Sequence, residues 1–325
     1  MRGTRPLLLF AILLCGASPT LASPFDPWRQ SATYDVNYEI DIQGLESETT
    51  TTLWVPLPAE NQDQTLNSQR SDSPWGFKQI TDSQGNAVAE LTIPAGPRDA
   101  SRVTFFYNIT RQPASGLDKT ALTANDQPKD FLKPLRKIPL DGVIQRIALE
   151  EKQKFAAGEN LQRGYYDYVY DLMTYSKEGE GWGQGDAVWA CQSKYGNCTD
   201  FHSLYIGLAR SQDIPARFKI GFPLSATEAS GRHDGYHCWA EAFSADQGWI
   251  PLDASEAKKA GLRDEYYGAL PSDRIELTQG RDIILSSNQR GAPINYFVYP
   301  YAESTTTITE RLPVKLTWTR ISQGI

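Results

Sequence analysis

The hydrophobic pattern changes its period along this chain, and the change restricts the folds that the chain can adopt. Apolar and polar residues alternate over residues 34–42, 53–57 and 103–109. A period of two, bounded by Gly, Pro, Asn and Ser, is typical of half-buried β-strands. Several such segments predict a small β-sandwich-like domain over residues 30–113.

After residues 114–134, a polar segment that we interpret as a linker, apolar residues recur at helical spacing. The segments with this spacing lie at residues 143–155, 166–173 and 201–208. Strand-like segments then return at residues 218–222, 238–243, 249–252 and 314–318. Helices followed by strands in one block indicate an α+β domain, which we place at residues 135–325.

Length, composition and charge exclude several classes of protein. The chain has 325 residues, of which 40% are hydrophobic and 22% charged, as is typical of a globular protein. The net charge of −7 and the pI of about 5.2 show no basic footprint, so no nucleic-acid partner is expected. No segment reaches the roughly 18 uninterrupted apolar residues of a membrane-spanning helix, so no membrane span is expected.

The first 22 residues have the pattern of a secretory signal peptide. Arg2 and Arg5 precede an apolar run at residues 7–14, and residues 20–22 (Thr-Leu-Ala) resemble a signal-peptidase site. Cleavage after residue 22 would remove two positive charges and no negative ones, which leaves a net charge of −9. The mature protein is therefore expected in the periplasm or secreted.

The cysteines give a further constraint. Cys15 falls within the predicted signal, and the preceding Leu14 is too large for a lipoprotein site, so we do not expect lipidation. The mature chain keeps Cys191, Cys198 and Cys238, and an odd number in an exported protein indicates one free thiol. A disulfide between Cys191 and Cys238 would leave Cys198 free. A buried, inert cysteine is the alternative interpretation.

Cys198 has the sequence setting of a nucleophile. It follows residues 195–197 (Tyr-Gly-Asn), which favour a turn, and it precedes the helix predicted near residues 201–208. A cysteine at a helix N-terminus lies at the positive end of the macrodipole, which favours the nucleophilic thiolate. We therefore interpret Cys198 as the candidate nucleophile.

A thiolate nucleophile needs a histidine partner, and the chain has three histidines. His202 lies one helical turn beyond Cys198 and stays open as an alternative base. His233 lies in a polar segment, where a solvated loop residue is expected. His237 opens a predicted strand and is the favoured base.

Asp253 is the predicted orienting residue for His237. Residues 237–243 and 249–253 read as a β-hairpin with its turn near Ala245. If residue 245 is the centre of the turn, His237 lies opposite Asp253, and their Cβ atoms come within about 5 Å. A carboxylate there would hold one imidazole tautomer and stabilise its protonated form. A bulge near Gly248 would shift this register.

Four sequence blocks resemble the core of the transglutaminase-like superfamily, most closely its exported bacterial members, which include proteins described as cysteine proteases. The blocks are residues 195–201 (YGNCTDF), 214–217 (IPAR), 237–241 (HCWAE) and 248–253 (GWIPLD). The resemblance covers about residues 135–260 and extends more loosely beyond them. It implies a papain-like fold with Cys198 as nucleophile, His237 as general base and Asp253 as orienting residue, preceded here by the β-sandwich-like domain.

Further residues are candidates for the site. Gln192 lies six residues before Cys198, the offset at which papain-like proteases place an oxyanion-hole glutamine, although a surface or structural glutamine is the favoured alternative. Trp182 and Trp239 are candidates for a substrate groove, with core packing favoured for Trp239. Zinc binding by Cys198, His202, His237 and Cys238 is disfavoured, because the adjacent residues 237 and 238 would point to opposite faces of a strand. No cofactor or metal is expected.

The function predicted from the sequence is exported, cysteine-dependent acyl transfer on amide or peptide bonds through a thioester at Cys198. Hydrolysis is favoured over crosslinking, because an exported bacterial enzyme meets abundant peptide and cell-wall amides. The expected substrate is therefore a peptide, protein or cell-wall amide. Protein-glutamine transamidation and a non-catalytic binding or assembly module that retains the fold are the alternatives.

Overall fold

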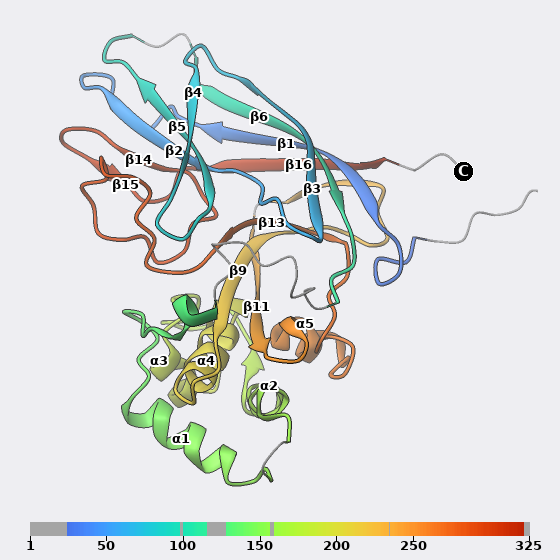
Figure 1. Ribbon diagram of the computed structural model, residues 1–325. Coiled ribbons are helices and arrows are strands. Elements are labelled where there is room, and N and C mark those ends of the chain that lie inside the picture. Colours follow the sequence, from blue (N-terminus) through green and yellow to red (C-terminus); the bar gives the residue numbers. More distant parts are fainter. Residues whose placement is uncertain (1–24, 98–99, 116–127, 157–158, 234, 322–325) are drawn as a thin grey trace, which may run out of the picture.

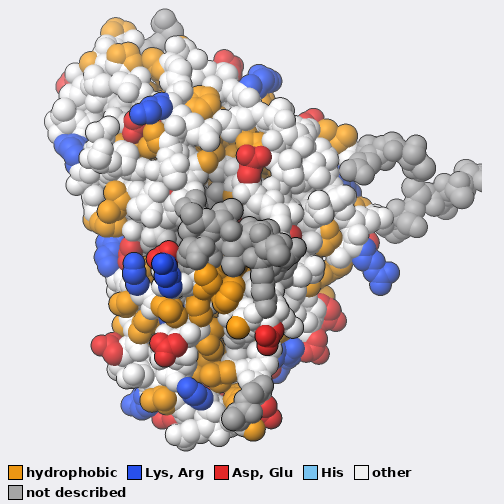
Figure 2. Space-filling model, viewed as in Figure 1, with side chains coloured by type: hydrophobic (Ala, Val, Ile, Leu, Met, Phe, Trp, Pro, Cys, Tyr) orange, Lys and Arg blue, Asp and Glu red, His pale blue; other side chains and the backbone are white. Residues whose placement is uncertain are grey.

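The computed structural model describes residues 25–97, 100–115, 128–156, 159–233 and 235–321. The predicted signal peptide lies outside these residues. Figure 1 shows a lobe of β-sheets above a lobe that contains the helices, with β9 (Ala216–Pro223) and β11 (His237–Ser244) running between them. Acidic and basic side chains are interspersed over both lobes on the face shown in Figure 2.

The β lobe is a sandwich of two five-stranded antiparallel sheets. The first has the order β10-β16-β1-β6-β3. Its strands are β1 (Ala32–Asp41), β3 (Gln64–Asp72), β6 (Arg102–Arg111), β10 (Ser230–His233) and β16 (Val314–Ile321). The second has the order β15-β14-β2-β5-β4. Its strands are β2 (Thr51–Pro56), β4 (Phe77–Thr81), β5 (Ala87–Ile93), β14 (Tyr301–Glu303) and β15 (Ile308–Thr309).

The alternation in the sequence explains why these strands pair as layers. Along β6, Val103, Phe105 and Ile109 are buried, and they pack in one cluster with Leu53 and Leu91 of the second sheet. Period-two burial of this kind is expected when one face of each sheet covers the other. The predicted β-sandwich-like region is therefore confirmed.

The predicted domain boundaries are wrong at the C-terminal end. β16 pairs antiparallel with β1, and β14 pairs antiparallel with β2, so the last strands complete the N-terminal sandwich. β10, from the middle of the predicted 135–325 domain, also joins this sandwich. Local hydrophobic periodicity predicts strands but not their partners, because pairing between distant segments is set by tertiary packing.

The helical lobe contains a four-stranded antiparallel sheet, in the order β12-β11-β9-β13, with helices against it. The two remaining strands of this sheet are β12 (Gly248–Leu252) and β13 (Arg274–Gln279). The helices are α1 (Gly142–Lys152), α2 (Leu161–Leu172), α3 (Ala187–Ser193), α4 (Cys198–Arg210) and α5 (Ala254–Ala260). A short 3₁₀ segment, Pro128–Leu132, and a two-stranded parallel pair, β7 (Thr174–Tyr175) with β8 (Tyr195–Gly196), complete the described elements.

The predicted α+β class is confirmed by this mixture of helices and antiparallel sheets. The sequence missed α3 and α5, each of seven residues, because so short a helix shows little periodicity. α4 is buried along its whole length and packs against β9 and β11. Among the helices in the described ranges, none is long and apolar enough to cross a membrane.

Gly221 allows a close approach between β9 and β13. The register of this pair shifts between Glu276 and Thr278, and a Cβ at position 221 would lie 1.8 Å from the backbone oxygen of Ile275. Gly221 also pairs with His237 on the other side of β9. Glycine is therefore required at this point by the backbone of the neighbouring strand.

We expect Gly221→Ala to lower the free energy of unfolding by about 3 kcal/mol, because two backbones must separate to admit the methyl group. Gly44→Ala is the matched control, since a Cβ there meets nothing within 4 Å. The control should stay within about 0.5 kcal/mol of the wild type. Urea denaturation followed by circular dichroism measures both, and equal stability of the two variants would contradict the argument.

Candidate active site

Cys198 is the first residue of α4 and is 2% exposed. Asn197 caps the helix, because its side-chain oxygen accepts the N–H of Thr199 at 2.9 Å. Asp200 Oδ2 accepts the N–H of Asn197 at 2.9 Å and completes a capping box. These two caps hold the thiol at the positive end of the helix dipole, as the sequence predicts.

Asp200 also fixes the glycine-rich loop in front of the helix. Its carboxylate accepts the N–H of Gly183 at 2.6 Å and that of Gly185 at 2.9 Å. Arg281 reaches the same loop, donating to the carbonyl of Gly185 at 3.1 Å and to Ser203 Oγ at 2.7 Å. The loop is therefore tied at several points to the helix that carries Cys198.

His237 and Asp253 form a short, buried hydrogen bond. The distance between His237 Nε2 and Asp253 Oδ2 is 2.6 Å, and Asp253 has no exposed surface. Asp253 Oδ1 accepts Ser255 Oγ–H and the N–H of Glu256, each at 2.9 Å. Arg274 donates to Oδ2 at 3.2 Å. The carboxylate therefore both caps α5 and orients the imidazole.

The predicted hairpin register is wrong by one position at its centre. Ala240 pairs with Leu252 and Ser244 with Gly248, so the hairpin is centred on Asp246. The ladder ends at Leu252, and Asp253 is the N-cap of α5. His237 and Asp253 are therefore not cross-strand neighbours. They meet because the chain turns from β12 into α5 at this residue.

The charges of the site support a thiolate–imidazolium pair. Burial alone would lower the pKa of His237, but the Asp253 carboxylate and the Cys198 sulfur raise it to about 10. Burial alone would raise the pKa of the Cys198 thiol, but hydrogen bonds from Cys238 and His237 hold it well below its usual range. Since Nε2 of His237 is bound to Asp253, Nδ1 is the ring nitrogen left for Cys198.

His202 lies behind the Cys198–His237 pair. It has no exposed surface, with Nε2 3.5 Å from Asp253 Oδ1 and Nδ1 3.6 Å from Cys238 Sγ. Burial lowers the pKa of His202, so this ring is neutral. His233 belongs to β10 of the sandwich, where its Nδ1 accepts the N–H of Gly235 at 2.9 Å, and not to a loop as predicted.

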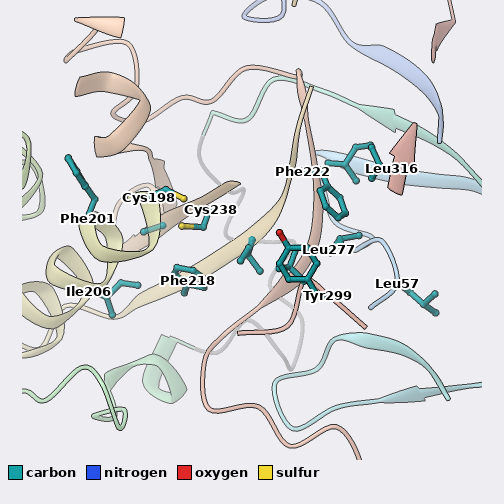
Figure 3. Packing of buried hydrophobic residues seen from close by; sticks show 14 of the residues in the cluster. Leu57, Cys198, Phe201, Ile206, Phe218, Phe222, Cys238, Leu277, Tyr299 and Leu316 are labelled. Atoms are coloured by element: carbon teal, nitrogen blue, oxygen red, sulfur yellow. The ribbon is translucent and has the colours of Figure 1, made fainter. Parts of the chain in front are cut away.

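The predicted Cys191–Cys238 disulfide is wrong. Cys191, Cys198 and Cys238 are all free and buried. The physical reason is the direction of Cys238, which points from β11 toward α4 and lies within 3.8 Å of Thr199 Oγ1. Figure 3 shows the sulfurs of Cys198 and Cys238 close together. Within the described ranges, no cluster of three or more His, Cys, Asp or Glu side chains is arranged to hold a metal ion.

The other predicted site residues lie in different environments. Gln192 is exposed on α3, and no hydrogen bond joins it to Cys198, His237 or Asp253 in the part of the chain that the structure describes. Trp239 is 1% exposed, packs with Ala114 and Leu270, and lies under the guanidinium of Arg274. Trp182 is half-buried in the glycine-rich loop. Trp239 is thus a core residue, which is the interpretation that the sequence favoured.

Two residues near Cys198, His237 and Asp253 were missed by the sequence. The hydroxyl of Tyr236 lies 2.9 Å from Thr199 Oγ1 and 3.0 Å from Asn197 Nδ2, directly above the start of α4. Arg274 reaches Asp253 from β13. Tyr236 precedes His237 in the chain, a position that could have drawn attention to it. Arg274 has no local signal, because only the tertiary fold brings β13 to α5.

A cavity of about 570 Å³ lies apart from this site, between the sandwich and the core sheet. Four of its charged side chains are paired: Arg217 Nε is 2.5 Å from Glu241, and Lys219 Nζ is 2.7 Å from Glu276. Its described lining does not include Cys198, His237 or Asp253. This cavity is therefore separate from the candidate site at the start of α4.

Known proteins resemble this chain at two levels: a family model matches residues 145–254, and one relative aligns over most of the chain. Residues 145–254 match the family model of the transglutaminase-like superfamily. An uncharacterized protein of Haemophilus influenzae is 26% identical over 321 residues, which cover 83% of this chain and 84% of the relative. The uncharacterized protein YebA of Bacillus subtilis is 23% identical over 186 residues, which cover 52% of this chain and 25% of YebA.

Among solved structures, one described as a "Putative Cysteine Protease" from Cytophaga hutchinsonii matches with a TM-score of 0.55 and 17% identity. The match covers 89% of this chain and 98% of that chain, so the two share a fold across both lobes. The family model and this shared fold agree with the sequence blocks around Cys198, His237 and Asp253. Residues 145–254 therefore form a domain of the transglutaminase-like superfamily, whose members are usually cysteine-dependent enzymes.

Proposed function

We propose that this protein is an exported cysteine hydrolase that cleaves amide or peptide bonds through a thioester at Cys198. The observation that carries the proposal is the buried hydrogen bond of 2.6 Å between His237 Nε2 and Asp253, beside a thiol at a helix N-terminus. This arrangement supplies a nucleophile, an acid–base group and an orienting carboxylate. The superfamily assignment of residues 145–254 supports it.

In the first step, the Cys198 thiolate attacks the carbonyl carbon of the amide. The carbonyl oxygen becomes an oxyanion, and the N–H of Cys198 is suited to stabilise it, since the first N–H groups of a helix have no partner within the helix. The Nδ1–H of the His237 imidazolium protonates the leaving amine as the C–N bond breaks. A thioester and a neutral His237 remain.

In the second step, water attacks the thioester carbonyl, and His237 Nδ1 accepts the proton of the water molecule. The C–S bond breaks, the carboxylic acid leaves, and the returned proton restores the imidazolium. Asp253 stays ionised throughout. When His237 is charged, its charge holds the pKa of this buried carboxyl well below its usual range, and while His237 is neutral the hydrogen bonds from Arg274, Ser255 and Glu256 remain. A primary amine in place of water would give transamidation with the same residues.

Hydrolysis is the proposed outcome because of the proposed location. The signal-like residues 1–22 direct the protein to the periplasm or the exterior, where peptides and cell-wall amides are abundant. The proposed partner is therefore a peptide, protein or cell-wall amide substrate. The chain carries a net charge of −7, which does not favour an anionic polymer as the substrate.

Cys198 should be the residue that an iodoacetamide-type probe labels near neutral pH. The pKa of Cys198 is lowered, whereas burial raises the pKa of Cys191. Mass spectrometry of tryptic peptides should show the label on Cys198, and Cys198→Ala should lose it, while Cys191→Ala keeps it. Undiminished labelling of the Cys198→Ala protein would count against this nucleophile.

Asp253→Asn should make the labelling of Cys198 depend steeply on pH. The raised pKa of His237 keeps its charged form present at neutral pH and loses it only as the pH rises toward about 10. Without the carboxylate charge, the imidazolium and its thiolate partner are lost at neutral pH, so labelling should rise about tenfold per pH unit up to an ordinary thiol pKa of about 8.5. Asparagine can still cap α5.

The wild type should label at a nearly constant rate over the same range. A profile of the Asp253→Asn protein that overlays the wild type would remove Asp253 from the triad. Circular dichroism spectra of the two proteins provide the control for folding.

Hydrolysis should proceed without an added amine. We expect the wild type to release free amine from members of a peptide and cell-wall peptide library in plain buffer, and the Cys198→Ala protein to release none. Product analysis by mass spectrometry should show a new carboxyl group. If product forms only when a primary amine is supplied, transamidation replaces hydrolysis as the activity.

A further inference from the structure

Cys238 is a second thiol in contact with the nucleophile, and the proposed mechanism does not use it. It follows His237 on β11, has no exposed surface and points toward α4. Its Sγ lies 3.6 Å from His202 Nδ1 and 3.8 Å from Thr199 Oγ1. The two sulfurs are seen together in Figure 3.

The neighbouring Asp253 decides which nitrogen of His202 carries the proton. Its oxygens accept four hydrogen bonds, from Ser255, the Glu256 N–H, His237 and Arg274. A carboxylate offers about four lone-pair positions, so none is left for His202 Nε2. Consistent with this, His202 Nε2 has no hydrogen-bond partner among the described residues.

The proton of the neutral His202 ring therefore resides on Nδ1. There it faces the backbone carbonyl of Cys198, one turn earlier on α4, and the sulfur of Cys238. A protonated Nδ1 donates to this carbonyl, so it offers no acceptor to Cys238 Sγ, 3.6 Å away. This leaves the S–H of Cys238 free to donate elsewhere.

Two acceptors compete for that S–H. Thr199 Oγ1 is 3.8 Å away and already shares a hydrogen bond of 2.9 Å with Tyr236. The sulfur of Cys198 is the other acceptor, and as a thiolate it is the stronger one, because hydrogen bonds to ionised acceptors are about twice as strong as neutral ones. The geometry thus directs the proton of Cys238 to Cys198.

We propose that Cys238 is a positioning residue for the proposed acyl transfer: its S–H donates to the Cys198 thiolate, and His202 offers that S–H no acceptor. The inference rests on the proposed function, since it needs Cys198 to act as a thiolate. Burial and the adjacent Cys198 raise the pKa of Cys238 well above its usual range, so this thiol stays protonated and remains a donor.

Other titratable groups also surround Cys198, so the test must isolate one of them. They are His202 and Asp200 on α4, His237 on β11, Asp253 and Glu256 at the start of α5, and Tyr175, Tyr236, Tyr296 and Tyr299. Burial raises the pKa of each of these tyrosines, so they stay neutral over the range in which Cys198 titrates. Substitution at position 238 leaves all of these groups in place.

The test compares the pH profile of Cys198 alkylation in Cys238→Ala, Cys238→Ser and Cys191→Ala proteins. Iodoacetamide is the probe, and mass spectrometry gives the rate at Cys198 from about pH 4 to about pH 10. We expect Cys238→Ala to raise the midpoint pH of Cys198 alkylation by about one unit or more. Cys238→Ser keeps a donor and should stay near the wild type, and Cys191→Ala should overlay it.

Cys238→Val fills the same space without a donor, and it serves as a second variant should the alanine protein fail to fold. A midpoint unchanged in the alanine or valine protein overturns the inference, and so does a serine protein that shifts as far as alanine. In both cases a low wild-type midpoint leaves the proposed function standing. A wild-type Cys198 that titrates like an ordinary thiol overturns both.

Discussion

The buried carboxylate of Asp253 is the interaction on which the site depends. It joins four elements: it caps α5, accepts from His237 on β11, accepts from Arg274 on β13 and faces His202 on α4. An ionised group without exposed surface is costly unless it is paired and hydrogen-bonded. Removing one partner of such a buried pair typically costs about 3–5 kcal/mol. The same contacts that orient the imidazole therefore also hold the helical lobe together.

The start of α4 shows how the sequence could predict the position of Cys198 but not its surroundings. The turn residues before Cys198 and the apolar spacing after it are local, so the helix and its N-terminal thiol could be read from the chain. His237 was likewise predicted from its strand. By contrast, Arg274 reaches the site only through the tertiary fold. The disulfide prediction failed because counting cysteines gives no direction for the side chain of Cys238.

The expected contact between His237 and Asp253 shows that a correct pair can follow from an incorrect geometry. The hairpin turn was placed one residue early, which would have made the two residues cross-strand neighbours. In the structure the ladder ends at Leu252, and the carboxylate reaches His237 from the N-cap position of α5. α5 has seven residues and no clear period, so the turn into it was not predictable. The contact between His237 and Asp253 thus follows from the position of Asp253 directly after β12, and it does not require the predicted strand register.

The sandwich positions β11, the strand that carries His237, through contacts that the sequence also did not predict. β10 pairs with β16, and the chain continues within a few residues into His237, so the start of β11 is anchored to the sandwich. From the other side, the amide of Gln64 on β3 bonds both the N–H and the carbonyl of Glu276 on β13, each at 2.8 Å.

β13 in turn pairs with β9, whose Gly221 lies beside His237. The site is nearly closed, with 2% of Cys198 and 4% of His237 exposed, so its geometry depends on how the surrounding elements pack. Packed interfaces move between discrete arrangements rather than deform continuously. The docking of the sandwich against β9, β11 and β13 therefore contributes to the position of His237 beside α4.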